Sequence, residues 1–409
     1  MNVTITPRLL SGTITPPPSK SQAHRLLIAA ALAEGDSVIS NVSLSQDITA
    51  TLSCMEALGA KVRWRDEATV VLTGIGGRKQ RAFPVLDCGE SGSTLRFLIP
   101  VALAVAGGGE FHGRGRLMQR PQEPYFEIFR EKGIAFSQSD DTLIIKGALT
   151  PGTYRLRGDV SSQFVTGLLY ALPLLEGDSE IVLTTALESS GYIDMTVDAL
   201  RHFGVEVRRT ETGWQVPGHQ RCRARDGAVE TDYSQSAFFY AMAGMGSALT
   251  VTGMNPDSRQ GDKIILDYAE KLDGPGAVTL DVRECPDLVP ALAARAALRD
   301  GETTRIVNAA RLRIKESDRL RSTAAVLGAL GAKVTEQADS LVIEGQASLK
   351  GGVTVDSWND HRIAMMAAVA ATRCREPVTI TGAECVSKSY PTFWRDYAAL
   401  GGRIATTEE

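Results

Sequence analysis

The sequence lacks any strong excess of charge and any long hydrophobic run, and both absences limit what the protein can do. Among 409 residues, 44 Lys and Arg stand against 48 Asp and Glu, which gives a net charge of −4. Because this balance provides no global basic field for nucleic acid, any anion site must be a local cluster. No stretch is apolar enough to span a membrane, and the first residues contain no hydrophobic core of a secretory signal. We therefore expect a cytoplasmic protein that binds neither nucleic acid nor membranes.

Metal-ligand and cysteine motifs are also scarce. The six cysteines are scattered and form no C-x-x-C pair, which is typical of free thiols in a reducing compartment rather than of disulfides or a zinc site. The five histidines are widely separated, and no carboxylate pair has the spacing of metal ligands. The phosphate loop G-x-x-x-x-G-K-[ST] is absent, because Gly12 has the wrong distance from Lys20. The sequence therefore predicts no metal ion and no cofactor.

What the sequence does contain is a repeat. A helix end of the form L-x-x-x-G-x-x-V recurs, and about 20 residues before each glycine a short β-type segment runs into a polar loop. The helix-ending glycines are Gly59, Gly133, Gly204, Gly331 and Gly401, with a degraded copy near Gly274. Six α/β units predict two domains of three units each. Periodicity alone does not decide whether the helices or the sheets face inward.

Charged and hydroxyl-rich clusters accompany the repeat, in PSKSQAHR, CGESGSTLR, RGRLMQRP, DVSSQF, CPDLVPALA, RIKESDRL and NDHRIAM. Lys20 stands between two serines at the predicted start of a helix, which favours an anion site but is equally typical of an ordinary N-cap. In RIKESDRL, the i, i+4 spacing places Lys315 and Arg319 on one helix face, where they repel unless an anion lies between them. Each cluster alone is explained at least as well by helix capping or by solvated charge.

Together and in this order, these segments, with QRP, SSGYID and VSKSYP, resemble the enolpyruvyl transferases, and among them the members that act on shikimate 3-phosphate. The resemblance covers essentially the whole chain. It implies a two-domain inside-out α/β barrel of six repeated βαβαββ-like units, three per domain, with helices inside and sheets outside. The first domain would comprise residues 1–18 and 230–409 and the second 19–229, with the active site in the cleft between them. It also implies a monomer.

The resemblance implies a reaction and a set of residues for it. The enolpyruvyl group of phosphoenolpyruvate would move to the 5-hydroxyl of shikimate 3-phosphate, giving 5-enolpyruvylshikimate 3-phosphate and phosphate. Asp287 is the expected base toward the hydroxyl and Glu316 the expected proton donor to carbon, with Lys20 assisting. The residues implied for shikimate 3-phosphate are Lys20, Ser21, Arg25, Ser161, Ser162, Gln163, Ser189, Tyr192, Asp287 and Lys315. Those implied for phosphoenolpyruvate, whose place the inhibitor glyphosate takes, are Lys20, Gly92, Arg120, Gln163, Arg319, Arg362 and Lys388.

Two alternatives remain open. A sister enzyme transfers the same group to UDP-N-acetylglucosamine and usually has a Cys in the loop that corresponds to RGRLMQRP, where this chain has none. An inactive binding scaffold would have lost the charged set, which is complete here. The chain departs from the common family pattern at five positions. The family usually has Asn where this chain has His24, Glu90 and Arg311, and Pro where it has Phe97 and Gly191. None of these departures removes a charged catalytic group.

Overall fold

Two compact units make up the chain. The computed structural model describes residues 1–78, 80 and 82–408. Residues 1–19 and 231–409 form one unit, here called the split unit, and residues 20–230 form the other, here called the inserted unit. The predicted domain crossings, near Pro18 and Glu230, lie beside these bounds.

In the described part of the inserted unit, six α-helices accompany three four-stranded sheets. The helices are α1 (Lys20–Leu32), α2 (Gln46–Ala57), α3 (Gly92–Ala106), α4 (Glu123–Lys132), α5 (Ser162–Ala171) and α6 (Ser190–His202), with short 3-10 turns η1 (Leu117–Gln119) and η2 (Leu172–Leu174). One sheet has the order β14 (Gly227–Ala228), β3 (Glu34–Ser40), β5 (Thr69–Ile75) and β4 (Lys61–Asp66). The second contains β6 (Val85–Asp87), β7 (Gly108–His112), β9 (Thr142–Lys146) and β8 (Ala135–Gln138). The third contains β10 (Gly152–Leu156), β11 (Ser179–Leu183), β13 (Gly213–Val216) and β12 (Arg208–Arg209).

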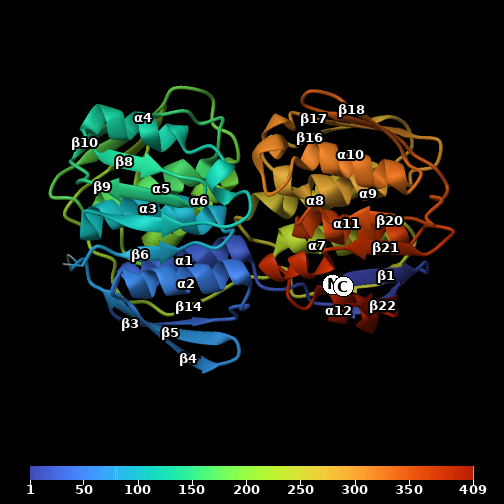
Figure 1. Cartoon of the computed structure of the whole chain (residues 1–409), viewed down its shortest axis with the longest axis horizontal. Helices are drawn as coiled ribbons and strands as arrows, with labels where there is room; N and C mark the ends of the chain where they lie inside the picture. Colours follow the sequence, from blue (N-terminus) through green and yellow to red (C-terminus); the bar gives the residue numbers. More distant parts are fainter. Residues whose placement is uncertain (79, 81, 409) are drawn as a thin grey trace. The chain divides into compact units, whose positions relative to one another are not determined.

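The split unit has the same kinds of element. Its helices are α7 (Tyr233–Gly244), α8 (Ile265–Asp273), α9 (Val289–Ala296), α10 (Arg319–Ala329), α11 (His361–Ala371) and α12 (Phe393–Ala399), with 3-10 turns η3 (Gly261–Ile264), η4 (Pro286–Leu288), η5 (Ala310–Ile314) and η6 (Ala383–Lys388). One sheet contains β16 (Val278–Asp281), β17 (Thr303–Val307), β19 (Leu341–Glu344) and β18 (Lys333–Glu336). Another contains β20 (Thr354–Asp356), β21 (Val378–Thr381), β1 (Asn2–Thr6) and β22 (Arg403–Thr407), so both ends of the chain pair in one sheet (Figure 1). The third pairs β15 (Ala248–Val251) with β2 (Ser11–Ile14).

The predicted repeat is visible in the strand order. In each four-stranded sheet the first two strands are parallel and the remaining pairs antiparallel, as in β6-β7-β9-β8. The sixth unit, which the sequence shows as degraded, contributes the two-stranded sheet. Five of the six helix-ending glycines have positive φ, as a left-handed helix end favours, whereas Gly274 has φ −72°. The degraded sequence copy therefore matches a structurally reduced unit.

Burial decides the question that periodicity left open. Every residue of α1 from Ala23 to Leu32 is buried, and α11 is buried over its whole length. The strands instead bury one face, as in β9, whose residues alternate between buried and outward-facing positions. Figure 1 shows the blue sheet strands β3, β5 and β4 along one side of α1 and α2. The helices therefore form the core of each unit and the sheets cover them, as the resemblance implied.

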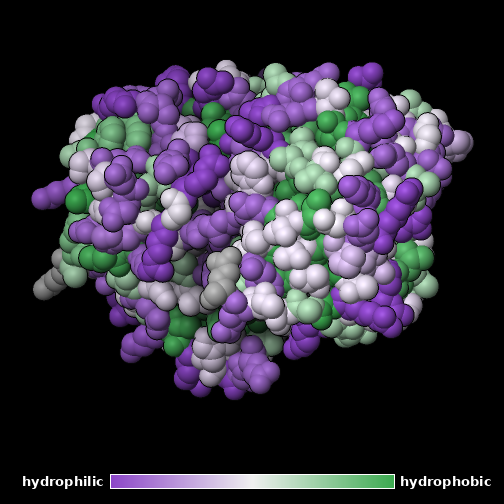
Figure 2. Space-filling model, turned by 45° about the vertical axis from the view of Figure 1, so that its right-hand side comes forward, coloured by the Kyte–Doolittle hydropathy of each residue, from purple (hydrophilic) through white to green (hydrophobic). Residues whose placement is uncertain are grey.

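The described surface offers few large hydrophobic side chains. Six are exposed, among them Phe83, Val85 and Ile144. The face in Figure 2 is mostly hydrophilic, with small separate hydrophobic areas. In the part of the chain that the structure describes, no helix combines the length and the hydrophobicity needed to cross a bilayer.

Candidate active site

Lys20 is the first residue of α1, and its ammonium group is held by a carboxylate from α2. Its Nζ donates to Asp47 Oδ2 at 2.7 Å, with only 16% of the lysine side chain and 11% of the aspartate side chain exposed. Sequence reasoning selected Lys20 but missed Asp47, although Asp47 lies in SLSQD, the first of the polar loops that follow the repeated strands.

Gly92 begins α3 and lies directly against the Arg120 guanidinium. Ser91 caps the helix by accepting a hydrogen bond from the Thr94 amide at 3.2 Å. A Cβ added to Gly92 would lie 2.5 Å from Arg120 Nη1, and Gly92 is not among the residues with positive φ. The glycine is therefore needed for close approach of Arg120 and not for a left-handed turn.

Gln163 is fixed by two side chains of α3. Its Oε1 accepts from Arg96 Nη1 at 2.9 Å, and its Nε2 donates to Ser93 Oγ at 3.0 Å. Arg96 also donates to the Pro121 carbonyl at 2.8 Å and packs over the Phe164 ring. Arg96 is thus a positioning residue for Gln163, a role that its place in CGESGSTLR did not reveal.

Arg25 is buried and already bonded on several sides. It donates to the carbonyls of Tyr192 and Ser21 at 3.0 and 2.6 Å and to Thr196 Oγ1 at 2.9 Å. Its guanidinium also lies over the Phe97 ring, 5.2 Å from the centroid. Burial lowers its pKa to about 10. Arg25 therefore holds α6 and the Ser21 backbone in place.

The predicted serines lie at helix starts. Ser161 is the N-cap of α5, and its Oγ accepts from the Gln163 amide at 3.3 Å. Ser162 is the first residue of that helix and is buried. Ser189 precedes α6 with φ 59°, a left-handed conformation that is uncommon for a residue with a side chain. The capping explanation thus holds for Ser161 without excluding a ligand role.

In the split unit, the Asp287 carboxylate is surrounded by cations. Its Oδ1 accepts from Arg319 Nη1 at 2.9 Å and from Lys315 Nζ at 3.3 Å. Arg362 donates to the Asp287 carbonyl at 3.0 Å and reaches the carboxylate at 3.5 Å. Burial alone would raise the pKa of this carboxyl, but the three cations outweigh burial and hold the pKa well below its ordinary value.

The prediction that Lys315 and Arg319 share a helix face is wrong. Helix α10 begins at Arg319, while Lys315 is extended with φ −85° and ψ −160°. Asp318 is the N-cap of α10, because its carboxylate accepts a hydrogen bond from the Arg321 amide at 3.1 Å. Lys315 therefore lies before the helix begins. The anion expected between the two cations does exist, and it is the carboxylate of Asp287.

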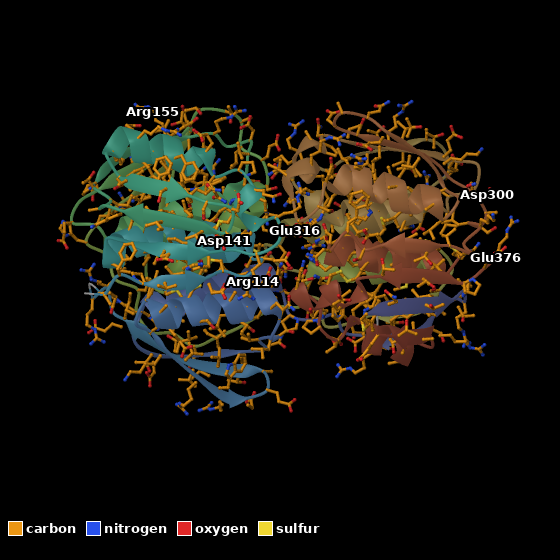
Figure 3. All side chains as sticks on the ribbon, viewed as in Figure 1. Arg114, Asp141, Arg155, Asp300, Glu316 and Glu376 are labelled. Carbon is orange, nitrogen blue, oxygen red and sulfur yellow. The ribbon has the colours of Figure 1, made fainter. Side chains whose placement is uncertain are left out.

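Arg319 is the most enclosed cation, with 1% of its side chain exposed. Its Nε donates to Asp360 Oδ2 at 2.7 Å, and its Nη2 lies 2.8 Å from Oε2 of Glu316, which Figure 3 labels. Lys388 Nζ donates to the Asn359 carbonyl at 2.7 Å, beside Asp360. Glu316 thus joins Asp287 and the cations in one half-buried charge cluster, and Lys388 bonds to the backbone next to Asp360.

The structure therefore brings the predicted residues into two sets, one within each unit. The inserted unit holds Lys20, Ser21, Arg25, Gly92, Arg120, Ser161, Ser162, Gln163, Ser189 and Tyr192. The split unit holds Asp287, Lys315, Glu316, Arg319, Arg362 and Lys388. Among the described residues, no group of three or more His, Cys, Asp or Glu could hold a metal ion.

Comparison with known proteins identifies the family. The family model for EPSP synthase (3-phosphoshikimate 1-carboxyvinyltransferase) matches residues 5–397. The chain belongs to the EPSP synthase family. It is 47% identical to the 3-phosphoshikimate 1-carboxyvinyltransferase of Clostridium acetobutylicum and 44% identical to that of Clostridium novyi, and each alignment covers 98% of both chains. The predicted family and enzymatic activity are confirmed by these matches, and enzymes of this family use shikimate 3-phosphate and phosphoenolpyruvate.

Solved structures of the EPSP synthase fold resemble the chain over its length. EPSP synthase from Acinetobacter baumannii matches with a TM-score of 0.80 at 26% identity, covering 99% of this chain and 100% of that one. The enolpyruvyl transferase NikO from Streptomyces tendae matches with a TM-score of 0.78 at 19% identity, covering 100% and 99% of the two chains, which shows the fold alone. The predicted enolpyruvyl transferase fold is confirmed.

Proposed function

We propose that, in the transfer of the enolpyruvyl group of phosphoenolpyruvate to the 5-hydroxyl of shikimate 3-phosphate, the Asp287 cluster of the split unit binds substrate anions and accepts a proton. The observation that supports this proposal is the half-buried Asp287 carboxylate beside Lys315, Arg319 and Arg362. The two substrates together carry two phosphates and two carboxylates, and ordered cations stabilise such charges without solvent reorganisation. A carboxylate in the same cluster supplies the group that accepts a proton.

The chemistry needs one proton acceptor and one proton donor in each half. In the addition step, the 5-oxygen of shikimate 3-phosphate bonds to C2 of phosphoenolpyruvate. The proton of the 5-hydroxyl moves to Asp287, and C3 takes a proton from Glu316 with Lys20 assisting. In elimination, C3 returns a proton, the C2–O bond to phosphate breaks, and the released phosphate carries away the electron pair and a proton. The bond between oxygen and phosphorus stays intact, so no phosphoryl group is transferred.

Asp287 can act as the base of this scheme only if substrate binding raises its low pKa. In the free enzyme the surrounding cations favour the ionised carboxylate and make it a weak base. Anionic groups of the substrates that bind Lys315 and Arg362 neutralise part of that charge. The pKa of Asp287 then rises toward the value that a general base needs. We thus expect substrate binding itself to activate Asp287.

The proposed binding residues are those that the family resemblance implies. Shikimate 3-phosphate binds Lys20, Ser21, Arg25, Ser161, Ser162, Gln163, Ser189, Tyr192, Asp287 and Lys315. Phosphoenolpyruvate binds Lys20, Gly92, Arg120, Gln163, Arg319, Arg362 and Lys388. Arginine suits these ligands because its planar guanidinium pairs with two oxygens at once.

The proposal includes a monomer that works in the cytoplasm. The six cysteines are free and buried, which suits a compartment that keeps thiols reduced. Size-exclusion chromatography with light scattering tests the monomer, because a dimer would elute with twice the mass of 43.8 kDa.

Phosphate release tests the reaction. The enzyme is incubated with phosphoenolpyruvate and a chelator, with either shikimate 3-phosphate or UDP-N-acetylglucosamine as the acceptor. We expect release with shikimate 3-phosphate alone and no effect of the chelator. Release with UDP-N-acetylglucosamine alone would transfer the assignment to the sister reaction, and release with neither acceptor would support an inactive scaffold.

A further inference from the structure

A buried chain of hydrogen bonds runs through three helices of the inserted unit. His24 Nδ1 lies 2.8 Å from Thr51 Oγ1, and Thr51 Oγ1 lies 2.7 Å from Thr94 Oγ1. Thr94 Oγ1 in turn donates to Ser91 Oγ at 2.7 Å. All four side chains have no measurable exposure to solvent. These hydrogen bonds thus connect α1, α2 and the N-cap of α3.

The direction of the hydrogen bonds follows from the number of protons. Each hydroxyl has one proton, and that of Thr94 is given to Ser91, so Thr51 donates to Thr94 and His24 donates to Thr51. This requires the neutral imidazole to carry its proton on Nδ1. Burial, followed by the charges of Lys20 and Arg25, holds the pKa of His24 well below its ordinary value, so the imidazole stays neutral. The other side of the ring meets Phe97 edge-on at 6.3 Å.

Each member lies near a residue of the proposed phosphoenolpyruvate site or near Asp47, the partner of Lys20. His24 follows Lys20 by four residues, and Thr51 follows Asp47 by four, so each pair shares a helix face. Ser91 and Thr94 flank Gly92. The Asp47 carbonyl lies 3.4 Å from Thr94 Oγ1 and is a second, longer acceptor for the single proton that Thr94 gives to Ser91 at 2.7 Å. The hydroxyl chain therefore lies one helical turn behind the groups that would contact the ligand.

We propose that His24, Thr51 and Thr94 form a positioning network that fixes the spacing of Lys20, Asp47 and Gly92, and so sets the affinity for phosphoenolpyruvate. The inference rests on the proposed function, because that function makes Lys20 and Gly92 ligand-binding residues. A displacement of about 1 Å in a ligand-positioning group can cost a large factor in affinity or rate. The network acts through Lys20 and Gly92 and does not itself touch substrate.

Thr51→Val tests the network, because it removes the central hydroxyl with little change of shape. With shikimate 3-phosphate saturating, we expect the KM for phosphoenolpyruvate to rise about three- to tenfold, because the variant removes both hydrogen bonds of this hydroxyl and part of that loss is felt at Lys20 and Gly92. Because Lys20 also belongs to the proposed shikimate 3-phosphate set and assists proton transfer, kcat should fall and the KM for shikimate 3-phosphate should rise, each by a smaller factor than the KM for phosphoenolpyruvate changes. Thr51→Ser, which keeps the hydroxyl, should restore the wild-type KM.

Thr304→Val is the matched control. Thr304 is equally buried in the split unit, and its Oγ1 accepts from Arg299 Nη1 at 2.8 Å. Its loss should lower thermal stability, as in Thr51→Val, without changing either KM. If Thr51→Val lowers stability alone and leaves the KM for phosphoenolpyruvate unchanged, the network is structural and the inference is overturned.

His24→Leu gives a second, independent measurement should Thr51→Val fail to fold. It removes the first donor and should raise the same KM by a similar factor, and a double variant should raise it by less than the product of the single effects. Additive effects would overturn the idea of one connected network. A wild-type enzyme that releases no phosphate would overturn the proposed function together with this inference, whereas an active wild type with unchanged variants overturns the inference alone.

Discussion

Replacing Gly92 with Ala adds one methyl group to the point where α3 meets Arg120. That methyl would lie 2.5 Å from Nη1, 2.8 Å from Cζ and 2.9 Å from Nη2 of the arginine. An ordinary contact begins near 3.4 Å, so the guanidinium must move by about 0.9 Å. Because the obstructing atoms are at the far end of a flexible side chain, the movement is possible and the protein still folds. Gly92 also has no positive φ, so alanine fits the helix start.

The displacement should weaken anion binding by a predictable amount. A hydrogen bond to a charged group contributes about 1.5–3 kcal/mol. Losing roughly half of that through misplacement raises the KM for phosphoenolpyruvate about tenfold. Glyphosate is slightly longer than phosphoenolpyruvate in the same space, so its inhibition constant should rise by a larger factor. We therefore expect a folded enzyme with weaker substrate affinity and still weaker inhibition.

Steady-state kinetics check this, with both constants measured at saturating shikimate 3-phosphate. Gly328→Ala is the matched control, because Gly328 lies in α10, lacks a positive φ, and has nothing within 4 Å of an added Cβ. It should leave both constants unchanged. In an Arg120→Gln background, Gly92→Ala should add little, since the methyl acts through that arginine. Equal factors for substrate and inhibitor, or a full additional loss in the double variant, would refute the reasoning.

Three further changes test the charged groups. Lys20→Ala should reduce kcat/KM by about 10²-fold or more. Because the variant leaves Asp47 buried without this partner, it should also lower the unfolding midpoint in urea. Activity within a few-fold of wild type would contradict the role of Lys20. Asp287→Ala should reduce kcat by about 10²–10⁴-fold, as expected for a proton-transfer group, and a change confined to KM would make Asp287 a binding residue only. The pKa values of Asp287 and Asp360 are both lowered in the folded state. The two carboxylates therefore stabilise the fold above the unfolded pKa of about 3.9, and this contribution is lost as the pH falls through the lower folded values. The free energy of unfolding measured in urea should decline below about pH 4, and a free energy that stays level or rises there would be inconsistent with these shifts.

The repeat could be predicted because it depends on local chemistry. A glycine after an apolar helix ends that helix in the left-handed region, and five such positions do so. The weak sixth copy at Gly274 was visible as a broken pattern, and its φ of −72° and its two-stranded sheet agree. The strands that precede the polar loops were equally visible from alternation, as in β7 and β17. Whether helices or sheets face inward needed the family resemblance, since the spacing of the repeat alone does not distinguish the two arrangements.

The cations of the candidate site were predicted from the sequence, as were the carboxylates of Asp287 and Glu316, whereas Asp47 and the partner of Asp360 were missed. A cation in a polar loop is conspicuous in a sequence, whereas Asp47 becomes meaningful only when α1 and α2 bring it to Lys20 at 2.7 Å. Asp360 lies beside Arg362 in the segment NDHRIAM, but it accepts from Arg319, 41 residues earlier. The hydroxyl chain through Thr51 was invisible for the same reason, because a buried threonine in a helix looks like ordinary core.

These missed carboxylates change how substrate affinity should be understood. The predicted cations already form ion pairs within the protein: Lys20 pairs with Asp47, and Arg319 pairs with Asp287 and Asp360. A buried charge without such a partner would cost several kcal/mol, so the internal carboxylates stabilise the free enzyme. Each substrate anion must therefore compete with a carboxylate that already lies in place, and only the difference between the two interactions contributes to binding. Affinity for phosphoenolpyruvate depends on that difference, and so Asp47 and Asp360 influence it as directly as the cations with which they pair.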